Sequence, residues 1–287
     1  MIATQGLPRT VSLPIEETPP PTLPDHLSWS QVSLMRACPQ KFHFQYVVKA
    51  APDFVPSSLK FGSAIHATLE AHFRAYMEGI ATDGPALLSA YRTAWNENDD
   101  ENIPVRFNKA EDQDTLEITT NGIFGAFLLS PLAEPAGKVI AVEESLCGSL
   151  APDLPDILAR VDLIWQDHQA VHLLDFKTSR SRWNTEQLAR NADQLRLYQA
   201  LARPLADQMP IHLHFGVLTK AKRPVVEILD VPSTDGGVET IIDAIRPVWE
   251  AITVGNFYPV PSPQNCTTCP FKSRCPAWAG SSSTTSC

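Results

Sequence analysis

The sequence predicts a mixed α/β fold, and the pattern of apolar residues is the main reason. In the first half, apolar residues recur at steps of four along several stretches, which is typical of amphipathic helices. After Pro135 the pattern changes to short β-rich runs, then to a helix, two more strands and a final helix. An antiparallel meander followed by a helix and further strands is a mixed α/β order. With 287 residues and 44% hydrophobic content, the chain can bury the core of one large domain, or of a domain with a helical insertion.

Four helices are expected before the strands. The start of the first helix is marked by Ser28 and Gln31, which have capping-box spacing, and the helix is expected to bend at Pro39. The second carries an apolar stripe and stops at Gly79. The third and fourth form a helical lobe over the core, within residues 84–129. The expected ranges are 27–48, 58–79, 84–98 and 113–129.

The second half is expected to build the sheet. Strands are predicted over 138–146, 157–165, 170–178, 211–219 and 225–231, and helices over 185–202 and 236–254. The second and third strands are joined through Asp167, His168 and Gln169, which suits a hairpin.

The two ends of the chain differ from the rest in composition. Residues 1–27 are rich in proline and hold no apolar run, so we expect a disordered lead-in without a secretory signal. Residues 279–287 are a Ser/Thr-rich tail and are expected to be disordered as well. No stretch approaches the length of a membrane span, so a soluble, cytoplasmic protein is expected.

The net charge of −9 argues against a uniformly basic nucleic-acid binder. Its distribution is uneven. Residues 170–223 hold nine lysines and arginines, Arg180 and Arg182 among them, against four acids, which is a local excess of +5. The basic stretch surrounds the motif that carries the chemistry.

That motif consists of Asp162, Asp175 and Lys177 in the meander. Residues two apart on a strand project to the same face, so Asp175 and Lys177 are neighbours. If the hairpin turns about 168 and 169, then Asp162 comes opposite Asp175. Opposed carboxylates among apolar neighbours repel unless a cation compensates them. A magnesium or manganese ion, which prefers oxygen ligands, would do so and would support phosphodiester hydrolysis.

The order of these motifs resembles a known family. Gly62-X3-His66 is followed by Arg-Val-Asp162-Leu-Ile, Leu-Asp175-Phe-Lys177-Thr and Gln194-X3-Tyr198. This order is similar to the RecB-like branch of PD-(D/E)XK nucleases, including the exonuclease of CRISPR adaptation and the nuclease domains of recombination helicase-nucleases. The resemblance covers residues 28–278 and implies a restriction-endonuclease-like core, a mixed β-sheet flanked by helices, with a C-terminal cysteine-rich segment over 266–278.

The resemblance also implies roles for individual residues. His66, Asp162 and Asp175 would be metal ligands, the Phe176 carbonyl would add another, and Lys177 would be catalytic together with the two acids. Gln194 and Tyr198, one helical turn apart, would face the active site and the DNA. The chain departs from the family pattern at Ala159, where a glycine is frequent, and at Asp175, where many relatives have glutamate.

Six cysteines in a chain without an export signal point to metal binding rather than disulfides. Cys266-X2-Cys269-X5-Cys275 supplies three thiolates, and the resemblance supplies Cys38 as the fourth. Spacing alone suits structural zinc, whereas the resemblance favours a 4Fe-4S cluster with a structural role. Cys147 is expected to be a small core residue and Cys287 to lie in the tail.

The expected function is an exonuclease that acts on single-stranded DNA or duplex ends. The basic stretch with Arg180 and Arg182 would guide the DNA, and Tyr198, Trp183 or Phe176 would stack on bases. The sequence holds no Gly-X4-Gly-Lys-Ser/Thr loop, so a helicase would be a separate partner, and a CRISPR integrase is another candidate partner. The alternative is a non-catalytic DNA-binding scaffold subunit, against which the intact Asp162, Asp175 and Lys177 argue.

Overall fold

The computed structural model describes residues 23–97, 102–232 and 237–278. The expectations of disorder for the proline-rich residues 1–22 and for the tail 279–287 lie outside the described residues. The helices are α1 Trp29–Ala37, α2 Pro39–Phe42, η1 His43–Val47, α3 Ser57–Met77, α4 Gly84–Asn96, α5 Gln113–Leu128, α6 Thr185–Ala202, η2 Arg203–Leu205, α7 Gly237–Thr253, α8 Pro263–Cys266 and η3 Lys272–Arg274. The strands are β1 His26–Ser28, β2 Val55–Pro56, β3 Val105–Arg106, β4 Lys138–Gly148, β5 Asp156–Gln166, β6 Val171–Ser179, β7 Ile211–Thr219 and β8 Val226–Val231.

A six-stranded mixed sheet forms the centre of the fold. β4, β5 and β6 make the expected antiparallel meander, β7 runs parallel to β6, and β8 returns antiparallel to β7. The parallel step from β6 to β7 is made through α6, because parallel neighbours need a crossover connection. The predicted mixed α/β fold with a sheet flanked by helices is confirmed.

One edge of β5 is only partly paired, and this gap positions the site described below. β4 pairs with one edge of β5 from Ile157 to Gln166. On the opposite edge, β1 pairs with Asp156–Leu158 and β6 pairs from Leu163 onward. Between β1 and β6, a short stretch of β5 that contains Asp162 is unpaired on this edge.

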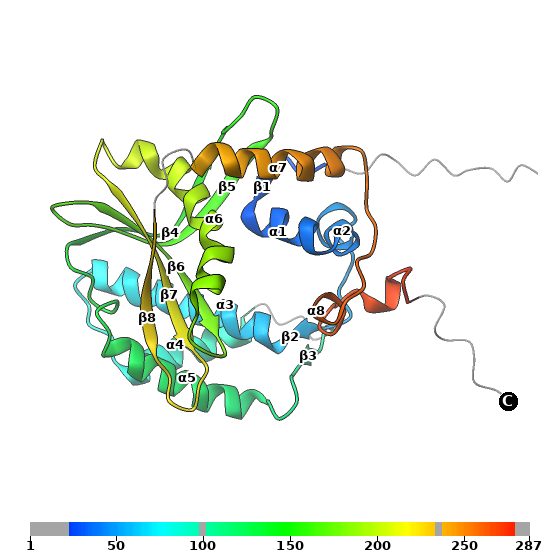
Figure 1. The fold of residues 1–287 in the computed structure, drawn as a ribbon. Coiled ribbons are helices and arrows are strands. Elements are labelled where there is room, and N and C mark those ends of the chain that lie inside the picture. Colours follow the sequence, from blue (N-terminus) through cyan, green and yellow to red (C-terminus); the bar gives the residue numbers. More distant parts are fainter. Residues whose placement is uncertain (1–22, 98–101, 233–236, 279–287) are drawn as a thin grey trace, which may run out of the picture.

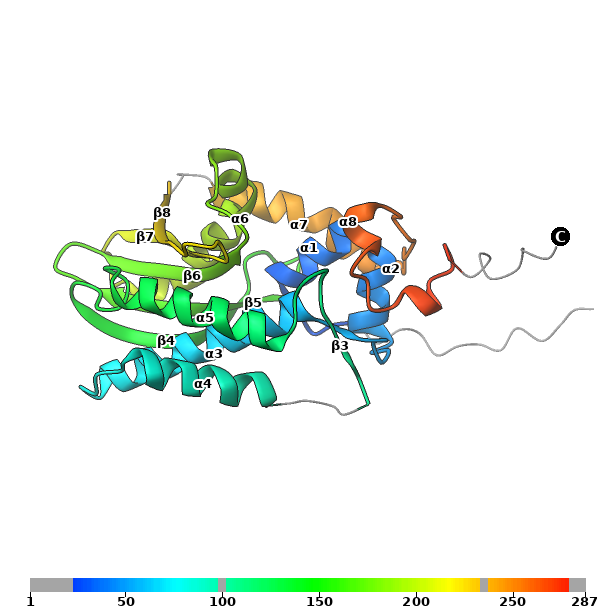
Figure 2. The same cartoon turned by 90° about the horizontal axis from the view of Figure 1, so that it is seen from below.

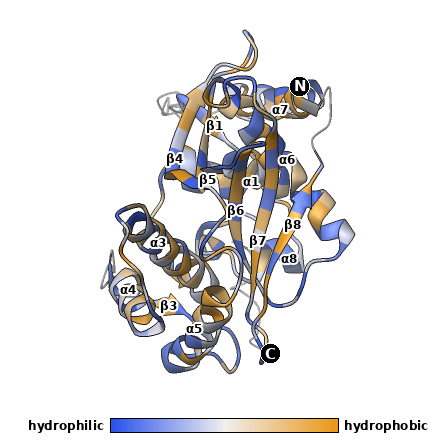
Figure 3. Cartoon of the chain, turned by 90° about the vertical axis from the view of Figure 1, so that its left-hand side faces the viewer, coloured by the Kyte–Doolittle hydropathy of each residue, from blue (hydrophilic) through white to orange (hydrophobic). Residues whose placement is uncertain are grey.

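Helices cover both faces of the sheet, with α3, α4 and α5 on one side and α6 and α7 on the other (Figures 1 and 2). Apolar side chains on the strands supply the core between these layers. Figure 3 shows the apolar residues along the strands as orange segments. The first core includes Phe73, Phe127 and Phe176 and lies under α3 and α5. The second lies under α6 and includes Leu195 and Phe215. A third packs α1 and α2 against α7.

The N-terminal helix is interrupted at Cys38 rather than bent. The Ser28 and Gln31 capping box is present at the start of α1. Cys38 then adopts an extended backbone, with φ −160° and ψ 98°, and the chain resumes as α2 at Pro39. The residue before a proline avoids the helical region because the ring Cδ clashes with it. The break turns Cys38 out of the helix.

The ordered chain begins earlier than its composition indicates. The composition places His26 and Leu27 at the end of a disordered lead-in, yet His26–Ser28 pairs in parallel with β5, and Leu27 is fully buried. A strand of three residues carries too little alternation to be seen in a sequence. Within the described residues, no helix has the length and apolar character needed to cross a membrane.

Candidate active site

Four polar side chains from three elements converge at the partly paired edge of β5. His66 lies on α3, Asp162 on β5, and Asp175 and Lys177 on β6. His66 Nδ1 lies 3.2 Å from Asp162 Oδ2, and Lys177 Nζ lies 2.7 Å from Asp175 Oδ2. The ladder between β5 and β6 ends at the pair Leu163 and Leu174, so the two aspartates are the next residues along the two strands. The structure therefore has the hairpin register that the sequence indicates.

The Asp162 side chain accepts a backbone hydrogen bond that a neighbouring strand would otherwise accept. Beyond Leu174, β6 diverges from β5, and the backbone N–H of Phe176 donates a hydrogen bond to Asp162 Oδ2 over 2.5 Å. The carboxylate thus satisfies a backbone donor that the adjacent strand no longer reaches. Because it binds both Phe176 and His66, this buried carboxylate is held in one position.

Asp175 is almost completely buried, with 3% of its surface exposed. Its Oδ1 accepts a hydrogen bond from Gln194 Nε2 over 2.7 Å, and Gln194 Nε2 also lies 2.7 Å from the Tyr198 hydroxyl. Its Oδ2 faces Lys177 but accepts no well-aligned hydrogen bond. A buried carboxylate is costly unless a cation accompanies it, and the Lys177 ammonium is that cation here.

The pKa values in this group reflect burial and crowding of charge. Burial raises the pKa of Asp175 to about 6, with the neighbouring Asp162 adding to the rise and Lys177 opposing it. Burial alone would lower the pKa of His66, but the hydrogen bond and charge of Asp162 and the charge of Asp175 outweigh it, so that pKa is raised. Both raised pKa values reflect the cost of placing several negative charges close together, and a positive charge beside the carboxylates would reduce that cost.

Glu143 is a member of the site that the sequence analysis missed. Its carboxylate, His66 and Asp162 offer ligand atoms that all lie within 4.8 Å of one another. Burial and then the charge of Asp162 raise the Glu143 pKa to about 7. The residue also has a left-handed backbone, with φ of 53°, which costs a residue other than glycine about 1 kcal/mol. The signal in the sequence was the pair Glu143-Glu144 inside an apolar strand, which alone does not tell which acid faces inward.

The converging side chains, apart from the buried Asp175, line a cleft of about 1020 Å³, part of which is open to solvent. His66, Glu143, Arg160, Asp162 and Lys177 are among its lining residues. Carboxylate oxygens beside a single imidazole suit a hard divalent cation such as magnesium or manganese better than zinc. The residues present therefore fit a divalent metal centre, and the observation that favours it is that ligand atoms of His66, Glu143 and Asp162 lie within 4.8 Å of one another.

Comparison with known proteins agrees with this geometry. The family model of the PD-(D/E)XK nuclease superfamily matches residues 26–276. The chain belongs to the PD-(D/E)XK nuclease superfamily. No curated protein matches the sequence at a significant level.

Two solved structures align with most of this PD-(D/E)XK nuclease, and one of them is similar in fold. One is described as a "Putative exonuclease" from Eubacterium rectale and has 13% sequence identity and a TM-score of 0.54, with 92% of this chain and 90% of that chain covered. The other, named SSO0001, has 13% identity over 85% of this chain and 95% of that chain, and its TM-score of 0.37 is too low to establish a shared fold. At such identities the first comparison supports the fold alone.

The residues expected to meet DNA lie in two different environments. Arg180 and Arg182 are exposed in the loop after β6, where Arg182 Nη1 lies 3.2 Å from Glu227 Oε1. Gln194 and Tyr198 are buried on α6, with 8% and 6% of their surfaces exposed, and their polar groups are used inside the protein.

The three aromatic side chains considered for base stacking are not equally placed. The Phe176 ring is buried in the core and packs on Phe73 and Phe127, and Tyr198 is buried as well. Neither ring offers a free face to a base. Trp183 is partly buried against Phe215 and is the most accessible of the three.

The structure also brings the four predicted cysteines of this nuclease together. Cys38, Cys266, Cys269 and Cys275 line one cavity, with Lys41 and Trp278 on its walls. No disulfide joins them. Burial raises the pKa of Cys269, the nearby Lys41 lowers it, and the neighbouring Cys38 and Cys275 raise it further. Four thiols around one cavity fit either a 4Fe-4S cluster or zinc. Cys147, expected in the core, is instead exposed, because it lies near the end of β4.

Hydrogen bonds hold the cysteine-bearing ends of the chain against each other. Asn265 Nδ2 donates to the Ala37 carbonyl over 2.7 Å, and the Gln40 N–H donates to the Tyr258 carbonyl over 3.0 Å. The Ser273 hydroxyl donates to Asp53 over 2.6 Å. The cavity is thus built jointly by the N-terminal helices and the C-terminal segment.

Proposed function

We propose that this chain is a magnesium- or manganese-dependent deoxyribonuclease that degrades single-stranded DNA or DNA ends as an exonuclease. The observation that supports it best is the convergence of His66, Asp162 and Lys177 in one cleft, with the buried Asp175 carboxylate 2.7 Å from Lys177. Membership in the nuclease superfamily supports hydrolysis of a phosphodiester bond.

The chain's own residues would divide the work as follows. His66, Asp162, Asp175 and the Phe176 carbonyl hold the cation, and Glu143 contributes a further carboxylate. When bound, the cation supplies Lewis acidity and an activated water for phosphodiester hydrolysis. Lys177, fixed by Asp175 at 2.7 Å, directs its ammonium group into the cleft and stabilises negative charge on the phosphate that reacts. Gln194 holds Asp175 in place rather than touching DNA.

DNA would approach along the basic loop that follows β6. Arg180 and Arg182 are exposed and come directly after the strand that carries Asp175 and Lys177. Contacts of guanidinium groups with phosphate guide nucleic acid without reading its sequence. A separate helicase or a CRISPR integrase would present the DNA, and co-purification of either with the full chain tests that part of the proposal.

The four cysteines would hold a 4Fe-4S cluster with a structural role. Their joint cavity joins the two ends of the chain, so the cluster would brace α2 against the C-terminal segment. Zinc in the same cavity is the competing assignment. Anaerobic purification followed by iron, sulfide and zinc analysis separates the two.

The test of the nuclease activity compares wild type with Lys177→Ala, using Lys109→Ala, an exposed lysine outside the cleft, as the matched control. The substrates are end-labelled linear single strands, end-labelled duplexes and closed circular single strands, with and without Mg²⁺ or Mn²⁺. We expect wild type and the control to degrade linear DNA only with metal, and Lys177→Ala to lose at least about 100-fold in rate.

Two results would contradict the proposal in different ways. Cleavage of the closed circle as fast as of linear DNA would show that the protein acts as an endonuclease rather than as an exonuclease. Wild-type protein that binds DNA but does not cleave it with either metal would make the chain a non-catalytic DNA-binding scaffold.

A further inference from the structure

A second cluster of chemically active side chains lies on the sheet, separate from the carboxylates. His172 is on β6, and His212 and His214 are on β7. His172 and His212 are direct partners in the parallel ladder, and His214 follows two residues later on the same face. One ring nitrogen from each of the three histidines lies within 4.8 Å of the others. The crossover through α6 brings these residues together, so nothing in the local sequence marks them as a group.

Two of the rings are oriented by carboxylates. His172 Nε2 lies 3.2 Å from Asp167 Oδ2, in the turn between β5 and β6. His214 Nδ1 lies 2.8 Å from Asp230 Oδ1, on the neighbouring strand β8. A carboxylate accepts a hydrogen bond, so each pairing places the ring proton on the nitrogen that faces the carboxylate. The other nitrogen of each neutral ring then carries a lone pair.

Those two lone pairs point at each other. His172 Nδ1 and His214 Nε2 are 2.9 Å apart. Two acceptor nitrogens at this distance repel unless a proton or a metal cation lies between them. A ring nitrogen of His212 also lies within 4.8 Å of both, and a metal cation would use this third ligand whereas a bridging proton would not.

We propose that His172, His212 and His214 bind a divalent transition-metal ion, with zinc as the ion that the ligand set suits best. Three imidazoles whose outer nitrogens meet carboxylates or solvent are an arrangement that proteins use for zinc. Asp167 and Asp230 then act as positioning residues that fix the two buried rings. A metal bound there would link β6 directly to β7, and the hydrogen bond between His214 and Asp230 would connect it to β8.

The surroundings of the cluster fit a small, partly enclosed site. The ring of Trp165 stacks on His172 with centroids 4.5 Å apart and planes within 6° of parallel. It also stacks on His214 at 5.3 Å, so it forms an apolar wall. The side chains of His172 and His214 are 12% and 11% exposed, while His212 is exposed and faces the solvent. An ion can therefore enter from the His212 side.

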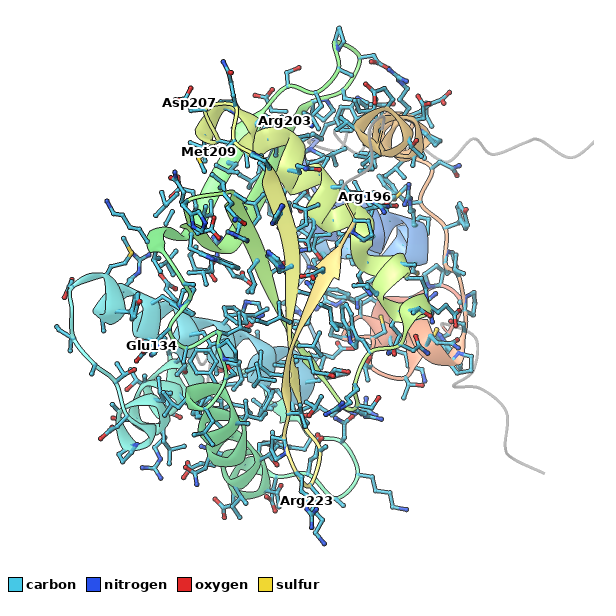
Figure 4. The ribbon with its side chains drawn as sticks, turned by 60° about the vertical axis from the view of Figure 1, so that its left-hand side comes forward. Glu134, Arg196, Arg203, Asp207, Met209 and Arg223 are labelled. Atoms are coloured by element: carbon cyan, nitrogen blue, oxygen red, sulfur yellow. The ribbon has the colours of Figure 1, made fainter. Side chains whose placement is uncertain are left out.

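This site is distinct from the proposed nuclease centre in both place and chemistry. His172 precedes Asp175 by three residues on β6, which corresponds to about 10 Å along a strand. In Figure 4, Met209, just before β7, marks the end of the sheet nearest the histidines, and Arg223, in the turn between β7 and β8, marks the opposite end. Imidazole nitrogens select zinc, cobalt or nickel, whereas the carboxylate centre selects magnesium or manganese. The inference does not depend on the nuclease proposal.

The test uses Co²⁺ as the probe with the full-length protein purified anaerobically. Bound cobalt is counted after equilibrium dialysis for wild type, His212→Ala and His168→Ala, an exposed histidine in the nearby turn that serves as the matched control. The cysteine cavity and the carboxylate centre are the same in all three proteins, so they cancel in the comparison. We expect His212→Ala to bind one equivalent fewer than wild type and than His168→Ala. The lost absorption should lie in the visible d–d region, without the charge-transfer bands that thiolate ligands give.

A second variant tests the carboxylates. Asp230→Asn keeps the shape of an exposed side chain and should weaken cobalt binding at the histidines by about 10- to 100-fold. Circular dichroism checks that each variant is folded. Equal cobalt content in folded wild type and folded His212→Ala would overturn the proposal. So would histidine NMR signals that change only with pH and not on adding Co²⁺ or Zn²⁺, because the occupant would then be a proton.

Discussion

Gln194 donates a hydrogen bond to Asp175 Oδ1 over 2.7 Å, and this bond ties helix α6 to the strand that carries the carboxylate. Replacing the amide with an apolar group, as in Gln194→Leu, would leave that buried oxygen without a donor. We expect the rate of DNA cleavage to fall by about 10- to 100-fold, with a matching rise in the Mn²⁺ concentration needed for half activity. The measurement is a metal titration of initial rates.

The matched control for this prediction lies on the same helix. Gln199→Leu removes an amide whose hydrogen bond goes only to the Ile211 carbonyl at 3.4 Å. Its metal dependence should equal that of wild type. An unchanged metal dependence in Gln194→Leu would show that Asp175 needs no support from α6.

Gly216 on β7 controls how closely the neighbouring strand can approach. A Cβ at this position would lie 2.8 Å from Phe176 Cδ1 and 3.2 Å from a methyl group of Leu132. Phe176 sits between Asp175 and Lys177, so Gly216→Ala should push the strand that carries both. We expect a loss of about 1–3 kcal/mol in the free energy of unfolding, together with reduced activity. Chemical denaturation measures the first, and normal stability in this variant would mean that the ring moves aside freely.

Glu143 makes the stability of the protein depend on pH when no divalent metal is added. Its pKa in the folded protein is raised to about 7, so the protonated form is favoured by folding. The associated stability is present at low pH and is lost as pH rises through about 7. Glu143→Gln removes the ionisation, and we expect it to stabilise the protein by about 1 kcal/mol at pH 8.5 and to have little effect at pH 5.

Thermal unfolding at several pH values checks this prediction, with Glu144→Gln at the adjacent position as the control. A constant difference between Glu143→Gln and wild type at all pH values would mean that the carboxylate does not titrate in this range. With Mn²⁺ present, the same variant should be less active than wild type, because it lacks a ligand oxygen.

The cysteine cavity can be tested by one substitution inside it and one outside. Cys269→Ser should abolish binding of the cofactor or metal and destabilise the protein by on the order of 4 kcal/mol, since loss of a structural metal is among the largest single effects. Cys147→Ser, at an exposed position, should leave both unchanged. Elemental analysis and thermal unfolding of both variants provide the readout, and equal metal content in the two would exclude the cavity as a binding site.

The sequence was most informative where periodicity and local register determine the structure. The strands that hold Asp162 and Asp175 and the turn at 168 and 169 could be predicted because alternation and a short hairpin fix which residues oppose each other. Convergence of His66 with them came from the order of motifs in a known family, since no local rule brings α3 to β5.

The features that escaped prediction depend on contacts between distant parts of the chain. β1 is a three-residue strand whose partner lies far along the sequence. Glu143 has a left-handed backbone conformation, which its residue type does not predict. His172, His212 and His214 meet only because β6 and β7 pair in parallel after an intervening helix. Burial of Tyr198 likewise depends on how α6 lies on the sheet.

The joint cysteine cavity has a consequence for the synthesis of the protein. Cys38 emerges from the ribosome long before Cys266, Cys269 and Cys275, the first of which follows it by 228 positions. Domains begin to fold during synthesis, so the first helices must wait for most of the chain before their final partners exist. A full complement of four thiolates thus requires that translation has passed Cys275. Prematurely terminated chains would lack it and would present their N-terminal helices, unsupported, to cellular proteases.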